Sequence, residues 1–122
     1  MEKPRIMVVE DEDNMRFLIS EELSDEGYLV DTAANGSECL RKFEEGSYDL
    51  VTIDIEMPDM SGLELAGLLR ERKIPVRIIL LTAYSHYKSD LSSWAADAYI
   101  VKSSNFLELK STIKELLNAT NA

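Results

Sequence analysis

Polar residues that could do chemistry follow four of the short apolar runs in this chain. They are the acidic stretch Glu10-Asp11-Glu12-Asp13, then Asp54, Thr82 and Lys102, after the runs 6–9, 50–53, 76–81 and 99–101 respectively. The set combines carboxylates with one hydroxyl and one ammonium group, and it contains no histidine or cysteine. Carboxylate oxygens without softer ligands favour a hard divalent cation, which points to Mg²⁺, with Mn²⁺ or Ca²⁺ as alternatives.

These groups suit phosphoryl transfer. The carboxylate of Asp54 is an available nucleophile, and a cation, Lys102 and Thr82 could share the charge of the three equatorial phosphoryl oxygens. Each residue also has a plainer interpretation. Acids such as Glu12 and Asp13 are common at helix N-termini, where they favour the helix dipole. Thr82 alone would be a strand-end residue, and Lys102 alone a surface lysine. Their common position at strand ends favours the chemical interpretation, most of all for Asp54, which two isoleucines flank.

The segments between these residues alternate between apolar runs and stretches with helical spacing. The runs predict five strands, at 6–9, 28–30, 50–53, 76–81 and 99–101. Apolar residues at helical spacing predict five helices, around 15–23, 39–43, 65–69, 86–96 and 106–117. Gly27, Gly46 and Pro75 mark the expected stops of the first three. Strict alternation favours parallel strands joined by right-handed helical crossovers, and so a three-layer α/β fold.

The strand order decides which of these residues meet. By analogy with flavodoxin-like doubly wound sheets, we expect the order 2-1-3-4-5. Ligands of such sheets bind outside the carboxyl ends of the strands, where the strand order reverses, which here lies between the first and third strands. Asp11 and Asp54 would face each other across that crevice. Carboxylates so close raise one another's pKa, and a divalent cation removes the conflict.

The composition fits one globular domain over residues 1–122, with 45% hydrophobic residues and a formal net charge of −10. No apolar run approaches the ~20 residues of a membrane helix, and the run 6–9 is shorter than a signal-peptide core of about 7–15 residues. Cys39 is the only cysteine, so no internal disulfide is possible. We therefore expect a cytoplasmic protein. The acidic excess and the lack of a Lys/Arg cluster argue against nucleic acid and anionic membranes as partners.

Four segments resemble, in order and spacing, the receiver domain of bacterial two-component response regulators, of the CheY-like single-domain kind. The resemblance covers essentially the whole chain. The segments are Ile6-Met-Val-Val-Glu-Asp-Glu12, Asp54-Ile-Glu-Met-Pro-Asp-Met-Ser-Gly62, Leu81-Thr-Ala-Tyr84 and Asp97-Ala-Tyr-Ile-Val-Lys102. They correspond to the family's first strand with its acidic pair, its phosphoacceptor loop, its switch hydroxyl segment and its fifth strand with an aromatic residue and a lysine.

The resemblance implies a phosphoacceptor signalling switch, active only in its own phosphorylation and dephosphorylation. Asp54 would receive the phosphoryl group from a histidine kinase or a phosphotransfer protein. Mg²⁺ would be bound directly by Asp11 and Asp54, by Glu10 through water, and by the backbone carbonyl of Glu56. Thr82 and Lys102 would contact the phosphoryl oxygens.

Further residues would tune the switch and pass on its state. The side chains of Glu56 and Tyr84, each two residues past a site residue, would fringe the site and control the access of water. Tyr99 would couple the movement of Thr82 to the face formed by residues 86–96, the strand 99–101 and the last helix. A downstream protein would bind that face.

Three residues depart from the family pattern. Glu10 replaces the commoner aspartate, Ala95 stands where a glycine is frequent, and Ser103 follows Lys102 where proline is usual. That proline commonly follows a cis peptide bond, a form that is rare before other residues, so the state of the Lys102–Ser103 peptide is left open.

Two other functions fit parts of the pattern. The first is a Mg²⁺-dependent phosphatase with an aspartyl-phosphate intermediate. Such enzymes usually carry a second aspartate two residues after the nucleophile, where this chain has Glu56, and no cap domain is evident. The second is a binding module that no longer uses phosphorylation. Against it, Asp11, Asp54 and Lys102 are all present.

Overall fold

One sheet of five parallel strands lies at the centre of the computed structural model, which describes residues 3–84, 95–103 and 105–120. The strands are β1 (Arg5–Val9), β2 (Leu29–Ala33), β3 (Leu50–Asp54), β4 (Arg77–Thr82) and β5 (Ala98–Val101). Their order in the sheet is β2-β1-β3-β4-β5, and every neighbouring pair is parallel. The predicted α/β class and strand order are confirmed.

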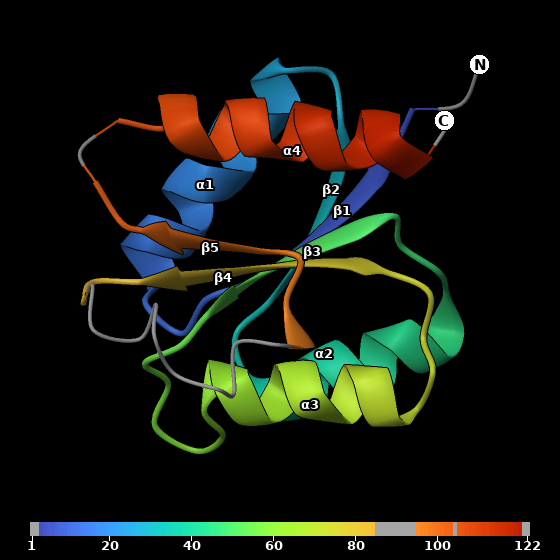
Figure 1. Ribbon diagram of the computed structural model, residues 1–122. Coiled ribbons are helices and arrows are strands. Elements are labelled where there is room, and N and C mark those ends of the chain that lie inside the picture. Colours follow the sequence, from blue (N-terminus) through green and yellow to red (C-terminus); the bar gives the residue numbers. More distant parts are fainter. Residues whose placement is uncertain (1–2, 85–94, 104, 121–122) are drawn as a thin grey trace.

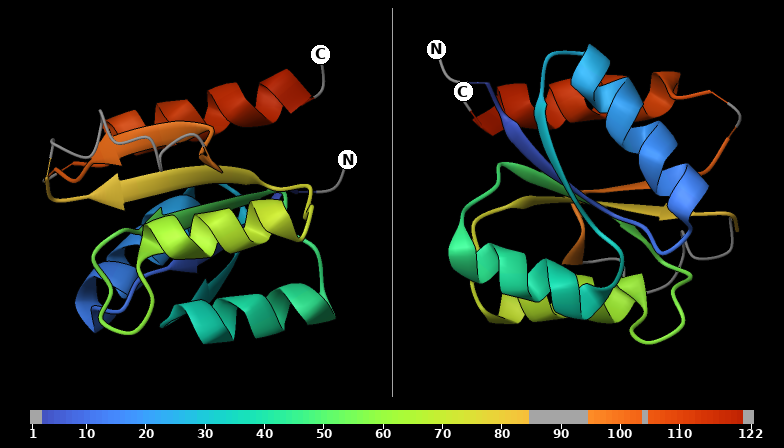
Figure 2. Two further views of the ribbon diagram at one scale, coloured as in Figure 1. Left: turned by 60° about the horizontal axis from the view of Figure 1, so that its bottom comes forward. Right: turned by 180° about the vertical axis from the view of Figure 1, so that it is seen from behind.

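Four helices in the described residues cover the two faces of the sheet. They are α1 (Asp13–Asp25), α2 (Gly36–Glu45), α3 (Gly62–Glu71) and α4 (Leu107–Thr120). Figures 1 and 2 show α1 and α4 on one face and α2 and α3 on the other. The helix α4 is the last of the five expected from the sequence. The helix expected at 86–96 lies almost entirely outside the described residues.

The strands are apolar on both sides because both faces are covered, and β3 is buried along its whole length. Alternate residues point to opposite faces and build two cores. On one face, strand residues such as Ile53 and Leu80 pack with α2 and α3 through Cys39 and Leu65. On the other, strand residues that include Ile6, Val8 and Ile79 pack with α1 and α4 through Ile19, Leu23 and Ile113. These two cores hold the sheet rigid beneath its carboxyl edge.

The register of the strands brings their carboxyl ends to one edge. Val9 pairs with Ile53, Asp54 pairs with Leu81, and Thr82 pairs with Val101. The residues that follow or end these strands therefore gather at that edge, as the sequence predicts.

The sequence places the end of β2 too early. The strand runs to Ala33, whereas the apolar pattern ends at Val30. Asp31 continues the strand because its carboxylate accepts hydrogen bonds from Tyr48 Oη at 2.7 Å and Lys42 Nζ at 3.2 Å. An edge strand tolerates such a residue when partners from the neighbouring helix and loop satisfy it.

Candidate functional site

Asp54 ends β3 at the carboxyl edge of the sheet, and only 2% of its surface is exposed. The chain must turn back sharply after it, because the amide of Gly62 donates to the carbonyl of Ile55 at 3.0 Å. A Cβ atom on Gly62 would lie 2.3 Å from the carbonyl oxygen of Asp54. Only glycine allows this approach, so Gly62 fixes the path of the loop that follows the buried carboxylate.

Two more carboxylates surround Asp54. Side-chain oxygens of Glu10, Asp11 and Asp54 all lie within 4.8 Å of one another. Glu10 is 1% exposed, whereas Asp11 faces solvent. The guanidinium of Arg16 donates to the carbonyl of Glu10 at 2.9 Å and pairs with Asp13 at 2.6 Å, which fixes the β1–α1 turn. Sequence reasoning missed this contact of Arg16, because nothing in the spacing singles it out from other helical arginines.

The remaining acids of the stretch serve α1. Glu12 caps the helix, accepting from the amides of Asn14 at 2.9 Å and Met15 at 3.1 Å, and its side chain is exposed. Asp13 is the first residue of the helix and also faces solvent. The helix-terminus interpretation therefore holds for both residues.

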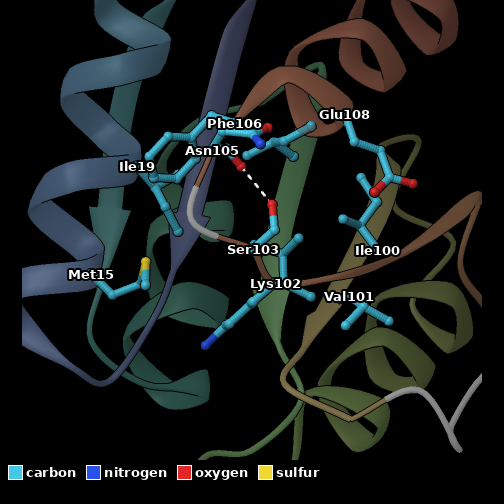
Figure 3. A pocket seen from close by; sticks show the side chains of 11 residues that line it. Met15, Ile19, Ile100, Val101, Lys102, Ser103, Asn105, Phe106 and Glu108 are labelled. Atoms are coloured by element: carbon cyan, nitrogen blue, oxygen red, sulfur yellow. Dashed lines mark hydrogen bonds between the residues drawn. The ribbon is translucent and has the colours of Figure 1, made fainter.

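Lys102 lies between two of the carboxylates. Its Nζ atom is 3.1 Å from Glu10 Oε1 and 3.1 Å from Asp54 Oδ1. Figure 3 shows its stem leaving β5 beside a small cavity that Met15, Ile19 and Phe106 help to line. No peptide bond in the described residues is cis, so the Lys102–Ser103 bond is trans.

The electrostatics of this cluster are unbalanced. Burial raises the pKa of Asp54, the neighbouring Glu10 raises it further, and Lys102 opposes both, which leaves the pKa at about 7. Burial lowers the pKa of Lys102, but Asp54 and Glu10 outweigh it, so that pKa is raised. The single ammonium group of Lys102 contacts two of the three clustered carboxylates. An all-oxygen donor set with this excess of negative charge fits a hard divalent cation.

Thr82 contributes a fully buried hydroxyl, which is tied to its neighbours. Its Oγ1 donates to Glu56 Oε2 at 2.5 Å and accepts from the amide of Tyr84 at 3.0 Å. The other oxygen of Glu56 accepts from the amide of Ala83 at 3.2 Å. The sequence predicts Glu56 at the fringe of the site but does not predict this contact, because it depends on how the loop after β3 folds under the end of β4.

The two residues expected to tune and read the switch lie at different depths. The side chain of Tyr84 is 54% exposed. Tyr99 is half-buried on β5, opposite Leu80, and packs against the core shared with α2 and α3. Because Tyr99 is two residues before Val101, the partner of Thr82, the side chains of Tyr99 and Thr82 lie on the same side of the sheet, two positions apart along the strands.

Comparison with known proteins gives one consistent result. The family model for the response regulator receiver domain matches residues 6–114. The response regulator TrrA of Thermotoga maritima, crystallised with Mg²⁺-BeF, is 64% identical, and the alignment covers 93% of this chain and 98% of that one with a TM-score of 0.89. TrrA has also been crystallised with the histidine kinase ThkA, and that structure gives 63% identity over 93% of this chain and 98% of that one, with a TM-score of 0.87.

Curated relatives are longer proteins. The transcriptional regulatory protein ResD of Bacillus subtilis is 37% identical over 93% of this chain, which spans 48% of ResD. TcrA of Mycobacterium tuberculosis is 33% identical over 92% of this chain, which spans 45% of TcrA. The chain thus spans about half the length of these relatives. Among the described residues, no helix has the length and apolar character needed to cross a membrane.

Proposed function

Because this chain belongs to the response regulator receiver domain family, we propose that it is a signalling switch that accepts one phosphoryl group on Asp54 with the help of Mg²⁺. The observation that carries the proposal is the buried Asp54 carboxylate in contact with Lys102 and within 4.8 Å of Glu10 and Asp11 oxygens. The similar TrrA was crystallised with Mg²⁺-BeF, which supports the choice of cation.

The residues present suit Mg²⁺ in definite roles. Asp11 and Asp54 would bind it directly, Glu10 through water, and the backbone carbonyl of Glu56 would add a neutral ligand. When bound, the cation supplies positive charge that offsets the carboxylates and the phosphoryl oxygens. The exposure of Asp11 gives the ion a path from solvent, while the buried Glu10 and Asp54 form the inner wall.

The reaction needs little from the protein beyond positioning and charge. A carboxylate oxygen of Asp54 would form the new bond to phosphorus while the bond between phosphorus and the donor nitrogen breaks. Lys102 is already 3.1 Å from Asp54 Oδ1 and would move with the developing phosphoryl charge. Hydrolysis of the resulting acyl phosphate would return the domain to its starting state. Apart from the phosphorylation and dephosphorylation of its own Asp54, we propose no enzymatic activity.

The signal would leave through Thr82 and Tyr99. A phosphoryl oxygen would draw the hydroxyl of Thr82, and Tyr99 would repack on β5 and change the face that a downstream protein reads. Thr82→Ala should then accept the phosphoryl group but transmit less of its effect. The measurement is the change that beryllofluoride causes in the amide chemical shifts of β5, in the wild type and in Thr82→Ala. If this route is wrong, that change will be the same in both proteins.

The partners follow from the same proposal. The complex of TrrA with a histidine kinase supports a histidine kinase, or a phosphotransfer protein, as the donor. We take residues 1–122 as one receiver domain that works in the cytoplasm and does not itself bind nucleic acid. The phosphatase alternative is disfavoured because Glu56, which stands in its general-acid position, is committed to Thr82.

The test is direct labelling. Incubation with Mg²⁺ and a small phosphodonor such as acetyl phosphate should add one phosphoryl group by intact mass, and Asp54→Asn should prevent it. Asp59→Asn, which changes an exposed acid of the same loop, is the matched control and should label normally. Equal labelling of Asp54→Asn would overturn the assignment, and so would rapid turnover of a generic phosphate ester by the wild type.

A further inference from the structure

The hydroxyl of Thr82 is held by Glu56 in a defined geometry. Thr82 Oγ1 donates to Glu56 Oε2 at 2.5 Å, and the amide of Ala83 donates to Glu56 Oε1 at 3.2 Å. Both oxygens of the carboxylate are therefore bound to the end of β4. One lone pair of the hydroxyl is also in use, because it accepts from the amide of Tyr84 at 3.0 Å.

The loop after β3 fixes Glu56 in this place. Ile55 and Met57 flank it, and both side chains are buried. The amide of Ile55 donates to the carbonyl of Leu81 at 2.8 Å, which continues the β3–β4 ladder past Asp54. Because its neighbours Ile55 and Met57 are both buried, the backbone of Glu56 has little freedom to move. The Glu56 carboxylate therefore stays beside the end of β4.

A hydroxyl group has one proton to donate. In the proposed function a phosphoryl group on Asp54 also requires that proton, because its oxygens are strong acceptors. The Glu56 carboxylate and the phosphoryl group therefore compete for the same donor, and Thr82 can satisfy only one at a time. The hydrogen bond from Thr82 to Glu56 and the one to the phosphoryl group are both charge-assisted. This contact alone therefore favours neither the resting nor the phosphorylated state by a large free energy.

We propose that Glu56 is a positioning residue that holds the Thr82 hydroxyl away from Asp54 and thereby weakens phosphoryl binding in the resting domain. This inference rests on the proposed function, since it needs a phosphoryl group at Asp54. The competing contact sets how readily the switch leaves its resting state. It differs from simple repulsion between the Glu56 charge and the phosphoryl group, because repulsion does not require Thr82.

A double-mutant cycle separates these two effects. The measured quantity is the affinity for beryllofluoride in the presence of Mg²⁺, followed by amide chemical shifts. Glu56→Ala should raise that affinity by about ten-fold when Thr82 is present, which is the scale of one hydrogen bond to a charged group. In the Thr82→Ala background the same substitution should raise the affinity for beryllofluoride by less than about three-fold, which is the part due to the loss of charge alone. Asp59→Ala, which removes an equal charge from the exposed part of the same loop, is the control and should give little change in either background.

Some outcomes overturn the competition, and others refute the proposed function. Equal gains from Glu56→Ala in both backgrounds, or no gain in either, overturn the competition. A failure of the wild type to bind beryllofluoride, or undiminished binding by Asp54→Asn, refutes the proposed function instead. If Glu56→Ala does not fold, Glu56→Gln keeps the side-chain length and a neutral acceptor. It should give a smaller gain in affinity in the same direction, and the gain should be larger with Thr82 present than in the Thr82→Ala background. Equal gains in the two backgrounds overturn the inference.

Discussion

Removing the charge of Asp54 should stabilise the domain in the absence of Mg²⁺. The pKa of this carboxyl is about 7 in the folded protein, against 3.8 as the ordinary value, because burial and then Glu10 disfavour its charged form. Below the ordinary value the carboxyl is protonated in both states, so the fold bears no penalty. As pH rises from there to the folded pKa, the unfolded chain releases its proton first, and stability falls. Above pH 7 the penalty is complete, and Asp54→Asn abolishes it.

The size of the effect follows from the pKa difference. About three pKa units at 1.36 kcal/mol each set an upper value of about 4 kcal/mol. That pKa already includes the attraction of Lys102, which keeps Glu10 as a partner in the variant, so we expect a net gain of about 2–4 kcal/mol. For a domain of this length that corresponds to a rise of roughly 5–15 °C in melting temperature.

The measurement is urea unfolding followed by circular dichroism, with EDTA present, for wild type, Asp54→Asn and Asp59→Asn. The gain of Asp54→Asn should be complete at about pH 8 and less than half as large at about pH 5, which lies in the first half of the interval between the two pKa values. The control removes an exposed carboxylate from the same loop and should change stability little. Added Mg²⁺ should narrow the gap, because it stabilises the wild-type carboxylates. If Asp54→Asn is no more stable than the wild type at the higher pH, the argument from a buried, crowded carboxylate is refuted.

Two further pairs of variants test the site and its support. Asp11→Ala should weaken Mg²⁺ binding at least about ten-fold in a calorimetric titration, since it removes a charged ligand, while Glu12→Ala should leave the affinity nearly unchanged and cost about 1 kcal/mol of stability through the lost helix cap. Similar affinities for the two variants would remove Asp11 from the metal site. Gly62→Ala should destabilise the fold by about 2 kcal/mol or more in urea unfolding, because its Cβ would lie 2.3 Å from the backbone oxygen of Asp54. Gly67→Ala, where a Cβ meets nothing within 4 Å in the middle of α3, should instead stabilise by about 0.5–1 kcal/mol, and equal losses at both glycines would argue against the steric account.

The sheet and the gathering of the candidate site residues at its carboxyl edge were predictable because each strand end has a local signal. An apolar run that stops at a charged residue marks both a buried strand and its carboxyl end, and parallel strands bring such ends to one edge. Asp54, Thr82 and Lys102 were found in this way, and the structure brings Lys102 to 3.1 Å from Asp54. The strand order itself came from analogy, because periodicity carries no information about which strands are neighbours.

What the sequence could not predict depends on the paths of loops and on partners far apart in the chain. The Glu56–Thr82 hydrogen bond joins residues 26 positions apart, and it exists because the loop after β3 is anchored on both sides of Glu56. The strand β2 continues through Asp31 to Ala33, where it pairs with β1, and Tyr48 and Lys42 satisfy the Asp31 carboxylate. No window of sequence holds both halves of such a contact, so pattern reasoning sees a polar residue and ends the element.

The unfavourable charge at Asp54 and the proposed chemistry are two aspects of one arrangement. A carboxyl with a pKa of about 7 is about half protonated at neutral pH, and a protonated carboxyl is a poor nucleophile. A divalent cation among Glu10, Asp11 and Asp54 would favour the ionised form and lower that pKa, so binding would release a proton and produce the nucleophile in one step. Lys102 cannot do this alone, because its one positive charge stands against a cluster of three carboxylates and contacts only two of them. The repulsion that weakens the metal-free fold is therefore what the cation relieves on binding, and the same cation would leave Lys102 free to move to the phosphoryl oxygens.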